Sequence, residues 1–256
     1  MTDKSRSPLK ENPLRTPGQS VQEHRNEVLD GLLTPVLGAT LFVMLAVLEW
    51  WRSFYPQPPQ PVTVSVMALL AVGYAAFRIV KGVPELRALR LARDGEKAVG
   101  QYLEQLRRDG YEVFHDVLGA GFNVDHVVIG TKGIFTVETK TRSKPAKGNA
   151  AIVFDGERVT VGGFAPDRDP VRQAKAQARW LRELLGSSTG KSLPVRPVVL
   201  FPGWFVEQKP GTPRDVWVLN EKAFPKFLAH EPNVLALEDV KLAAFHLARY
   251  IRTQAE

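Results

Sequence analysis

The segment NVDHVVIGTKGIFTVETK, residues 123–140, contains two apolar, β-branched runs on either side of Gly130-Thr-Lys-Gly133. This pattern is typical of a β-hairpin with a short turn. If the turn centres between the Thr and the Lys, Asp125 lies directly opposite Glu138, and paired residues project from the same face of the sheet. Lys140, two residues further on, shares that face. The sequence therefore predicts two carboxylates and one ammonium at one end of an otherwise apolar hairpin.

These three side chains suggest a particular chemistry. Two facing carboxylates repel each other unless a cation lies between them. A hard divalent ion with oxygen ligands fits, and Mg²⁺ is the usual ion where phosphates are handled, with Mn²⁺ as the alternative. We therefore expect Asp125 and Glu138 to bind the metal and to take part in catalysis. Lys140 is the third catalytic candidate, because it can orient an attacking water or neutralise charge that develops on the phosphate.

Several motifs in the same order resemble a known family. An acidic residue, a strand and then Glu138-Thr-Lys140 resemble the signature of the PD-(D/E)xK nucleases. The fuller pattern resembles the NERD (nuclease-related domain) family. The resemblance covers roughly Arg93 to Phe201 and is carried by Gly95-Glu96, Asn123-Val-Asp-His126, Gly133-Ile-Phe and Val137-Glu-Thr-Lys140. Val124 stands where the signature has proline, an absence that is common in this superfamily.

The resemblance implies an α/β fold of the restriction-endonuclease-like kind, with a central mixed sheet flanked by helices. It also implies that Glu96 joins the metal site. The alternative for Glu96 is a first-turn glutamate that the helix dipole favours. Gln173 matches a helix glutamine of the superfamily and is a candidate substrate contact or support for the site. The alternative for Gln173 is an ordinary polar residue on the helix surface.

Basic residues suggest where a polyanion binds. Arg142 and Lys144 follow the hairpin and are candidates for sequence-independent contacts with phosphates. The alternative is a solvated basic loop. The formal net charge of +7 also favours polyanionic partners, either nucleic acid or acidic lipid head groups. We therefore expect DNA or RNA as a partner, bound with low sequence specificity.

Other chemistries lack support in the sequence. The chain has no cysteine, which excludes disulfides and thiolate metal sites. No Walker-type glycine loop, Gly-x-Ser-x-Gly elbow or kinase signature is present, so we expect no small-molecule cofactor. Alternation places His126 on the face opposite to Asp125, which predicts a packed or hydrogen-bonded histidine rather than a ligand.

The N-terminal third has a different composition. Residues 1–25 are polar and basic, which predicts a disordered tail. Two apolar runs follow, and residues 28–51 and 62–80 are each close to the length of about 20 residues that crosses a bilayer. Trp50, Trp51 and Tyr55 would then lie at a membrane interface. The alternative is a pair of buried core helices in a soluble protein, and a cleaved signal peptide fits less well because a second span follows.

The flanking charges predict an orientation for this pair of helices. The proline-rich loop between the runs carries a single charge, Arg52, whereas Lys and Arg are frequent before the first run and after the second. By the positive-inside rule both termini are cytoplasmic. We therefore expect a multi-pass protein of the cytoplasmic (inner) membrane, with the lipid bilayer as a second partner. Residues 81–93 form a basic connector, and residues 94–256 form the nuclease-related domain in the cytoplasm.

Within that domain the pattern predicts alternating helices and strands. The first helix runs from a cap at Asp94 to Gly110, and a later one runs from Asp169-Pro170 to about Leu185, with Gly186 at its end. Asp155-Gly156 predicts the turn of a second hairpin. The other expected elements are strands at 111–117, 195–201 and 215–219, and helices at 221–229 and 238–252.

Two hypotheses for function follow. The first is a membrane-anchored, Mg²⁺-dependent nuclease that hydrolyses phosphodiester bonds of DNA or RNA on the cytoplasmic side. The second is a catalytically inactive nuclease-like module that binds nucleic acid or a protein partner at the membrane. Asp125, Glu138 and Lys140 together favour the first, because a scaffold has no physical reason to keep two facing carboxylates beside a lysine.

Overall fold

The computed structural model describes residues 14–54, 60–144, 151–166, 169–213 and 215–254. It divides into two compact units. The first unit, Ser20–Leu91, is a pair of helices. The second unit combines the chain up to Gln19 with the chain from Ala92 onward, and it is a mixed α/β domain.

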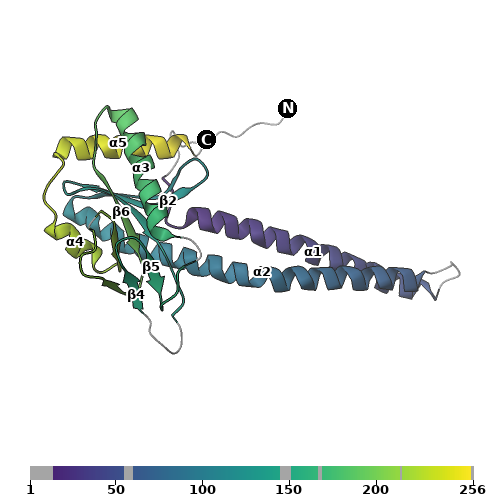
Figure 1. Ribbon diagram of the computed structural model, residues 1–256. Coiled ribbons are helices and arrows are strands. Elements are labelled where there is room, and N and C mark those ends of the chain that lie inside the picture. The colour runs from purple at the N-terminus through teal and green to yellow at the C-terminus, as the bar shows by residue number, and fades with distance from the viewer. Residues whose placement is uncertain (1–13, 55–59, 145–150, 167–168, 214, 255–256) are drawn as a thin grey trace, which may run out of the picture. The chain divides into compact units, whose positions relative to one another are not determined.

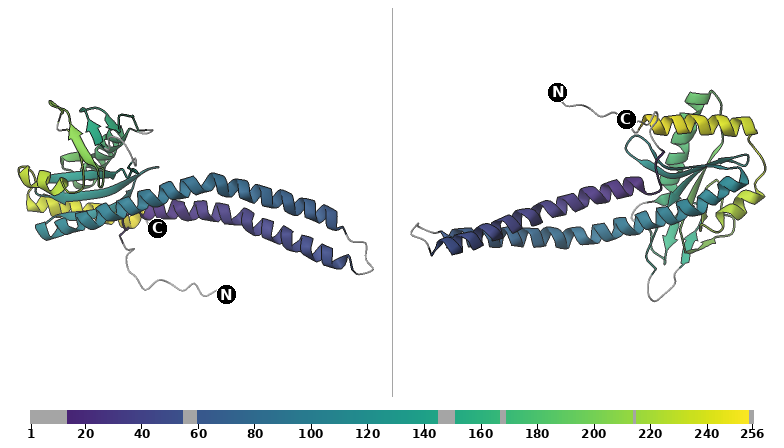
Figure 2. Two further views of the ribbon diagram at one scale, coloured as in Figure 1. Left: turned by 90° about the horizontal axis from the view of Figure 1, so that it is seen from below. Right: turned by 180° about the vertical axis from the view of Figure 1, so that it is seen from behind.

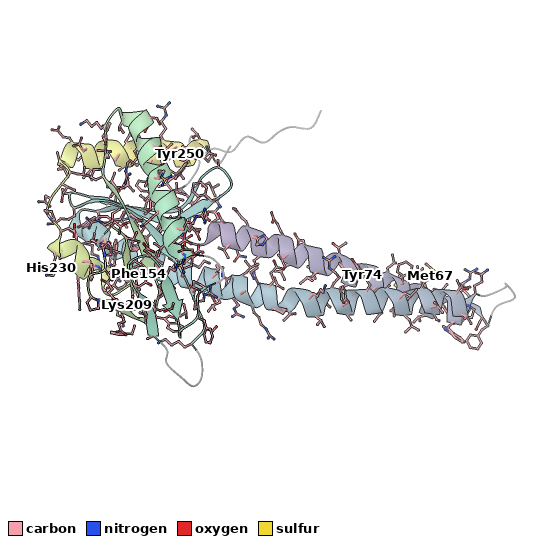
Figure 3. The ribbon with its side chains drawn as sticks, viewed as in Figure 1. Met67, Tyr74, Phe154, Lys209, His230 and Tyr250 are labelled. Atoms are coloured by element: carbon pink, nitrogen blue, oxygen red, sulfur yellow. The ribbon has the colours of Figure 1, made fainter. Side chains whose placement is uncertain are left out.

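Helix α1 (Gln19–Arg52) and the part of helix α2 (Pro61–Leu103) up to Leu91 lie side by side in the first unit (Figures 1 and 2). The Trp50 indole donates a hydrogen bond to the Ser65 hydroxyl at 3.1 Å, which joins the two helices near the loop. Both helices are long and apolar enough to cross a membrane, by length and composition alone. Only 6% and 11% of their most apolar windows is buried, so they are not core helices within the described part of the chain. Met67 and Tyr74, for example, project outward from α2 (Figure 3).

Three expected boundaries in this region differ from the structure. Residues 19–25 belong to α1 rather than to a disordered tail, and residues 1–13 lie outside the described residues. The expected connector 81–93 is part of α2, and the helix runs on through Asp94, which therefore caps nothing. The physical reason is that this stretch is rich in Leu, Arg, Glu and Ala and contains no stop signal that outweighs their helix propensity.

The main sheet holds five strands in the order β1-β2-β3-β6-β8. The first three strands are antiparallel, and β3, β6 and β8 are parallel, so the sheet is mixed as expected. A smaller sheet has the order β5-β4-β7, and the hairpin of β4 and β5 forms around Asp155-Gly156 as predicted. The strands are β1 (Glu112–Leu118), β2 (Asn123–Gly130), β3 (Gly133–Thr139), β4 (Ala151–Phe154), β5 (Val159–Val161), β6 (Val195–Leu200), β7 (Phe205–Gln208) and β8 (Trp217–Leu219).

The register of the β2–β3 hairpin is the one that the sequence predicted. Gly130 pairs with Gly133 and His126 pairs with Val137, so the turn centres between Thr131 and Lys132. Continued by one residue, this register puts Asp125 opposite Glu138.

Helices cover both faces of the main sheet. Helices α3 (Pro170–Thr189) and α5 (Leu237–Thr253) pack over Val127 and Ile129 of β2 (Figure 1). The end of α2 and helix α4 (Phe224–His230) pack over Val128 on the opposite face. Alternate residues of one strand thus enter two separate cores, which explains why β2 and β3 are apolar throughout.

The helix ends follow local signals, with one correction. The Asp169 carboxylate accepts hydrogen bonds from the backbone N–H groups of Val171 and Arg172, at 2.9 and 3.2 Å, and caps α3 as predicted. However, α3 continues past Gly186 and ends at Gly190, whose φ is +69°. At the end of α2 a 3₁₀ turn (Glu104–Asp109) leads to Gly110, which terminates it in the left-handed region.

Candidate functional site

Asp125 and Glu138 are brought together at one end of the β2–β3 hairpin, on the face that α3 covers. Asp125 is the third residue of β2, and Glu138 is the penultimate residue of β3. Both are buried, with 5% and 2% of their surface exposed. The backbone N–H of Thr139 donates a hydrogen bond to Asp125 Oδ2 at 2.7 Å, which fixes one carboxylate against the neighbouring strand.

Lys140 is held between a strand and a helix. Its Nζ donates to Glu138 Oε1 at 2.5 Å and to Gln173 Oε1 of α3 at 3.0 Å. Lys140 therefore joins the two carboxylates as the sequence predicted, and Gln173 touches the site rather than solvent alone. An ammonium has three N–H donors, so one remains for an oxygen of a substrate or a water.

Gln177, one helical turn after Gln173, is a site residue that the sequence analysis missed. Its Nε2 donates to Glu138 Oε2 at 2.5 Å and to the Asn123 carbonyl at 3.0 Å. The i, i+4 spacing of two glutamines on the apolar face of α3 was the signal that could have found it. Both oxygens of Glu138 are thus engaged, one by Lys140 and one by Gln177.

Glu96 approaches the same site from α2. It is only 6% exposed, and its Oε2 has no hydrogen-bond partner among the described residues. The preceding Gly95 lets the helix come close, because a Cβ there would lie 1.7 Å from Thr141 Oγ1. Since α2 begins at Pro61, the alternative that Glu96 is a first-turn glutamate is wrong. A buried carboxylate oxygen without a partner needs another explanation, such as an ion.

The electrostatics of these residues favour a cation. Burial raises the pKa of Glu96 to about 8, with further increases from the charges of Asp116 and Glu138 and a decrease from Lys140. Burial also raises the pKa of Asp125 well above its usual range, and Glu138 and Glu96 add to that rise. The negative charge of the cluster thus exceeds what Lys140 offsets.

The donor set fits a hard metal ion, since every candidate ligand atom is a carboxylate oxygen. Within the described ranges, no three Asp, Glu or His side chains are spaced to hold a metal together. Asp125 and Glu138 are the pair that the hairpin register brings together. The part of Glu96 as a third ligand stays a prediction.

The remaining predicted residues fall into two groups. His126 lies on the opposite face, fully buried, with its Nδ1 2.9 Å from Nδ1 of His115, so it is the packed, hydrogen-bonded histidine that was expected. Arg142 and Lys144 are exposed. The Arg142 carbonyl accepts a hydrogen bond from the Trp204 indole, and Lys144 Nζ lies 5.8 Å from the Trp204 ring centroid. Their role in substrate binding stays a prediction.

A fourth buried acid, Asp116, acts electrostatically on Glu96 and was also missed. It lies in β1 between His115 and Val117, which pair with His126 and Val124 of β2, and it has φ at +51° and no exposed surface. Its carboxylate accepts hydrogen bonds from Asn123 Nδ2 at 3.0 Å and from Arg15 Nε at 2.7 Å. A contact between residues 101 positions apart leaves no local pattern in the sequence.

Comparison with known proteins agrees with the motifs. A search of curated proteins finds no match. One solved structure, SfsA of Pyrococcus furiosus in complex with Ca²⁺, is 19% identical with a TM-score of 0.22. The match covers 59% of this chain and 52% of that chain, so this chain spans about half the length of that protein. The family model described as the nuclease-related domain, NERD, matches residues 91–202, the region that holds Glu96, Asp125, Glu138 and Lys140. Residues 91–202 are therefore similar to the nuclease-related domain.

Proposed function

We propose that this protein is a metal-dependent nuclease that hydrolyses phosphodiester bonds of DNA or RNA. The observation that carries the proposal is the contact of Lys140 Nζ with Glu138 and Gln173, beside the buried Asp125. The nuclease-related domain at residues 91–202 supports the same reaction class. Two buried carboxylates beside a partly buried lysine at a strand end are costly unless they serve a site.

The side chains have distinct roles in the proposed reaction. Asp125 and Glu138 hold Mg²⁺ or Mn²⁺, which supplies Lewis acidity and charge neutralisation toward a phosphate when bound. Lys140 directs its remaining N–H to the attacking water or to a phosphate oxygen, where negative charge develops in the transition state. Gln173 and Gln177 restrict the rotamers of Lys140 and Glu138, so that both groups are in position before substrate arrives.

The outer side of α3 offers a path for the phosphate backbone. Gln173 of this helix touches Lys140, and Arg172, Lys175 and Arg179 on its exposed side line a hollow of about 670 Å³. Lys175 is paired with Asp215 at 2.8 Å. Arg172 and Arg179 have exposed side chains without an ion pair among the described residues, which leaves them for phosphates.

We expect the double variant Arg172→Gln/Arg179→Gln to bind nucleic acid more weakly and with less dependence on salt. Each lost phosphate contact reduces the slope of log affinity against log salt by about 0.9 for duplex DNA, so the slope should fall by up to about 1.8. Fluorescence anisotropy with a labelled oligonucleotide in EDTA, at several salt concentrations, measures the slope without cleavage. Lys241→Gln/Arg249→Gln on α5 removes the same charge elsewhere, and an equal fall there would contradict the α3 path.

We also propose that the helix pair anchors the protein in a membrane, with the nuclease-related domain in the cytoplasm. The length and apolar composition of α1 and α2 support a span by each helix. The excess of Lys and Arg outside the loop supports cytoplasmic termini. The exposure of large apolar side chains on both helices would be unfavourable in water.

Topology can be measured with reporter fusions in the whole chain. We expect a phosphatase that is active only outside the cytoplasm to be active when inserted in the loop at residues 55–59, and inactive when fused after residue 256. A fluorescent protein that matures only in the cytoplasm should give the reverse pattern. A cytoplasmic signal from the loop would overturn the proposed orientation, and a loss of membrane association in carbonate-washed fractions would show that the helices do not span.

A further inference from the structure

We propose that Arg15, which lies outside the nuclease-related domain match, is a positioning residue for the site. The inference rests on the proposed function. A series of hydrogen bonds connects it to Glu138 and Lys140, two of the three catalytic candidates. Arg15 Nε donates to Asp116 Oδ2 at 2.7 Å, and Asn123 Nδ2 donates to Asp116 Oδ1 at 3.0 Å.

The path of hydrogen bonds continues from Asn123 to Glu138, the proposed metal ligand. Gln177 Nε2 donates both to the Asn123 carbonyl at 3.0 Å and to Glu138 Oε2 at 2.5 Å, while Lys140 binds the other oxygen of Glu138. The atoms of this path are buried or partly buried, so water competes little with each link. A displacement at Arg15 can therefore reach Glu138 through contiguous contacts.

Asp116 needs its partner because of where it lies. The Asp116 side chain is fully buried, and that of Arg15 is 10% exposed, so removing the guanidinium takes a cation away from a buried carboxylate. The backbone of Asp116 is in the left-handed region, which a non-glycine residue adopts at a cost unless its surroundings hold it there. Loss of Arg15 should therefore release strain at Asp116, in the strand that pairs with the strand of Asp125.

The segment that carries Arg15 packs closely on the end of α2. A Cβ on Gly100 of α2 would lie 2.5 Å from Pro17 Cγ, so Gly100 leaves the space that Pro17 fills. Gly18, with φ at +70°, lies against Arg93. Gly100 is one helical turn after Glu96 on the same helix. The segment thus packs on the helix that carries Glu96.

A residue that positions others without touching substrate has a distinct kinetic signature. Arg15 is buried behind the site, so its loss should lower kcat and leave KM for nucleic acid unchanged. We expect Arg15→Met, in the whole chain in detergent, to lower kcat for a labelled oligonucleotide with Mn²⁺ by at least about tenfold, with KM within twofold. Arg15→Met/Asp116→Asn should recover part of kcat, because asparagine tolerates positive φ and carries no unpaired charge.

A measurement without activity tests the same inference. Hydrogen exchange of the metal-free chain should increase in peptides covering residues 14–18 and 112–125 of Arg15→Met, and not in the peptide covering 129–137. Gly100→Ala, which displaces Pro17 and removes no charge, should give the same pattern. Thr16→Ala changes an exposed neighbour and should match wild type in both measurements. Wild-type kcat and wild-type exchange in Arg15→Met would overturn the inference. If the wild type never cleaves, the proposed function fails. The hydrogen-exchange measurement then still decides whether Arg15 orders the site.

Discussion

Lys140→Met should abolish metal-dependent cleavage while nucleic-acid binding is nearly retained. The ammonium contacts the Glu138 carboxylate directly, and removing a preorganised charge from a transition state typically costs roughly 10²- to 10³-fold in rate. Methionine keeps the length of the side chain. Single-turnover cleavage with Mg²⁺ or Mn²⁺ measures the loss, and anisotropy at fixed salt in EDTA measures binding.

Glu138→Gln tests the proposed metal ligand and should lose cleavage by orders of magnitude as well. Its two oxygens accept from Lys140 and Gln177, whereas a glutamine offers one oxygen and one NH₂ group. The NH₂ group must then face one of these donors, so some loss of folding stability should accompany the loss of activity. Binding should survive or tighten, because a negative charge that faces phosphate has been removed. Circular dichroism of each variant separates a local change from unfolding.

Two outcomes would change the assignment. A wild-type protein that binds nucleic acid and never cleaves it with either ion would favour the inactive module that recruits nucleic acid or a partner. Equal cleavage by wild type and Glu138→Gln would mean that the activity comes from another site or from a contaminant. The first outcome is a real alternative, since no three acidic or histidine side chains among the described residues are already spaced for a metal.

The parts of the site that could be predicted are those encoded by local pattern. Alternation around Gly130-Thr-Lys-Gly133 fixed the hairpin register and hence the pairing of Asp125 with Glu138. The Asp169-Pro170 pair located the start of α3, which carries Gln173. Each of these signals lies within a few residues of the element that it specifies, so one sequence is enough to read it.

The parts that could not be predicted depend on tertiary packing. The contact of Arg15 with Asp116 joins residues far apart in the chain, and no periodicity marks either of them. The continuity of α2 through Asp94 reflects a cap residue that the flanking helix formers override. Strand β7 (Phe205–Gln208) is a short edge strand that exists because β4 offers it a parallel partner.

Glu96 should make the metal-free protein less stable as pH rises. Its pKa is raised in the folded state from an ordinary 4.5 to about 8, first by burial and then by Asp116 and Glu138. The folded state therefore binds more protons than the unfolded state in this range, and stability falls between about pH 4.5 and pH 8. The penalty is on the order of 3 kcal/mol at pH 7. The raised pKa of Asp125 acts in the same direction.

Glu96→Gln should relieve this penalty, because glutamine keeps the size of the side chain and cannot ionise. In a chelator at pH 7 the variant should melt roughly 6–12 °C above the wild type, at about 2–4 °C per kcal/mol for a chain of this size, with little difference at pH 4.5. Glu183→Gln, an exposed glutamate of α3, should show no such gain. Because a divalent ion competes with protons for the same oxygens, Mg²⁺ or Mn²⁺ should raise the apparent Tm of the wild type most at high pH, and that of Glu96→Gln less. Equal Tm values for wild type at pH 4.5 and pH 8 without metal would show that Glu96 is not the strained acid that makes the site attract a cation.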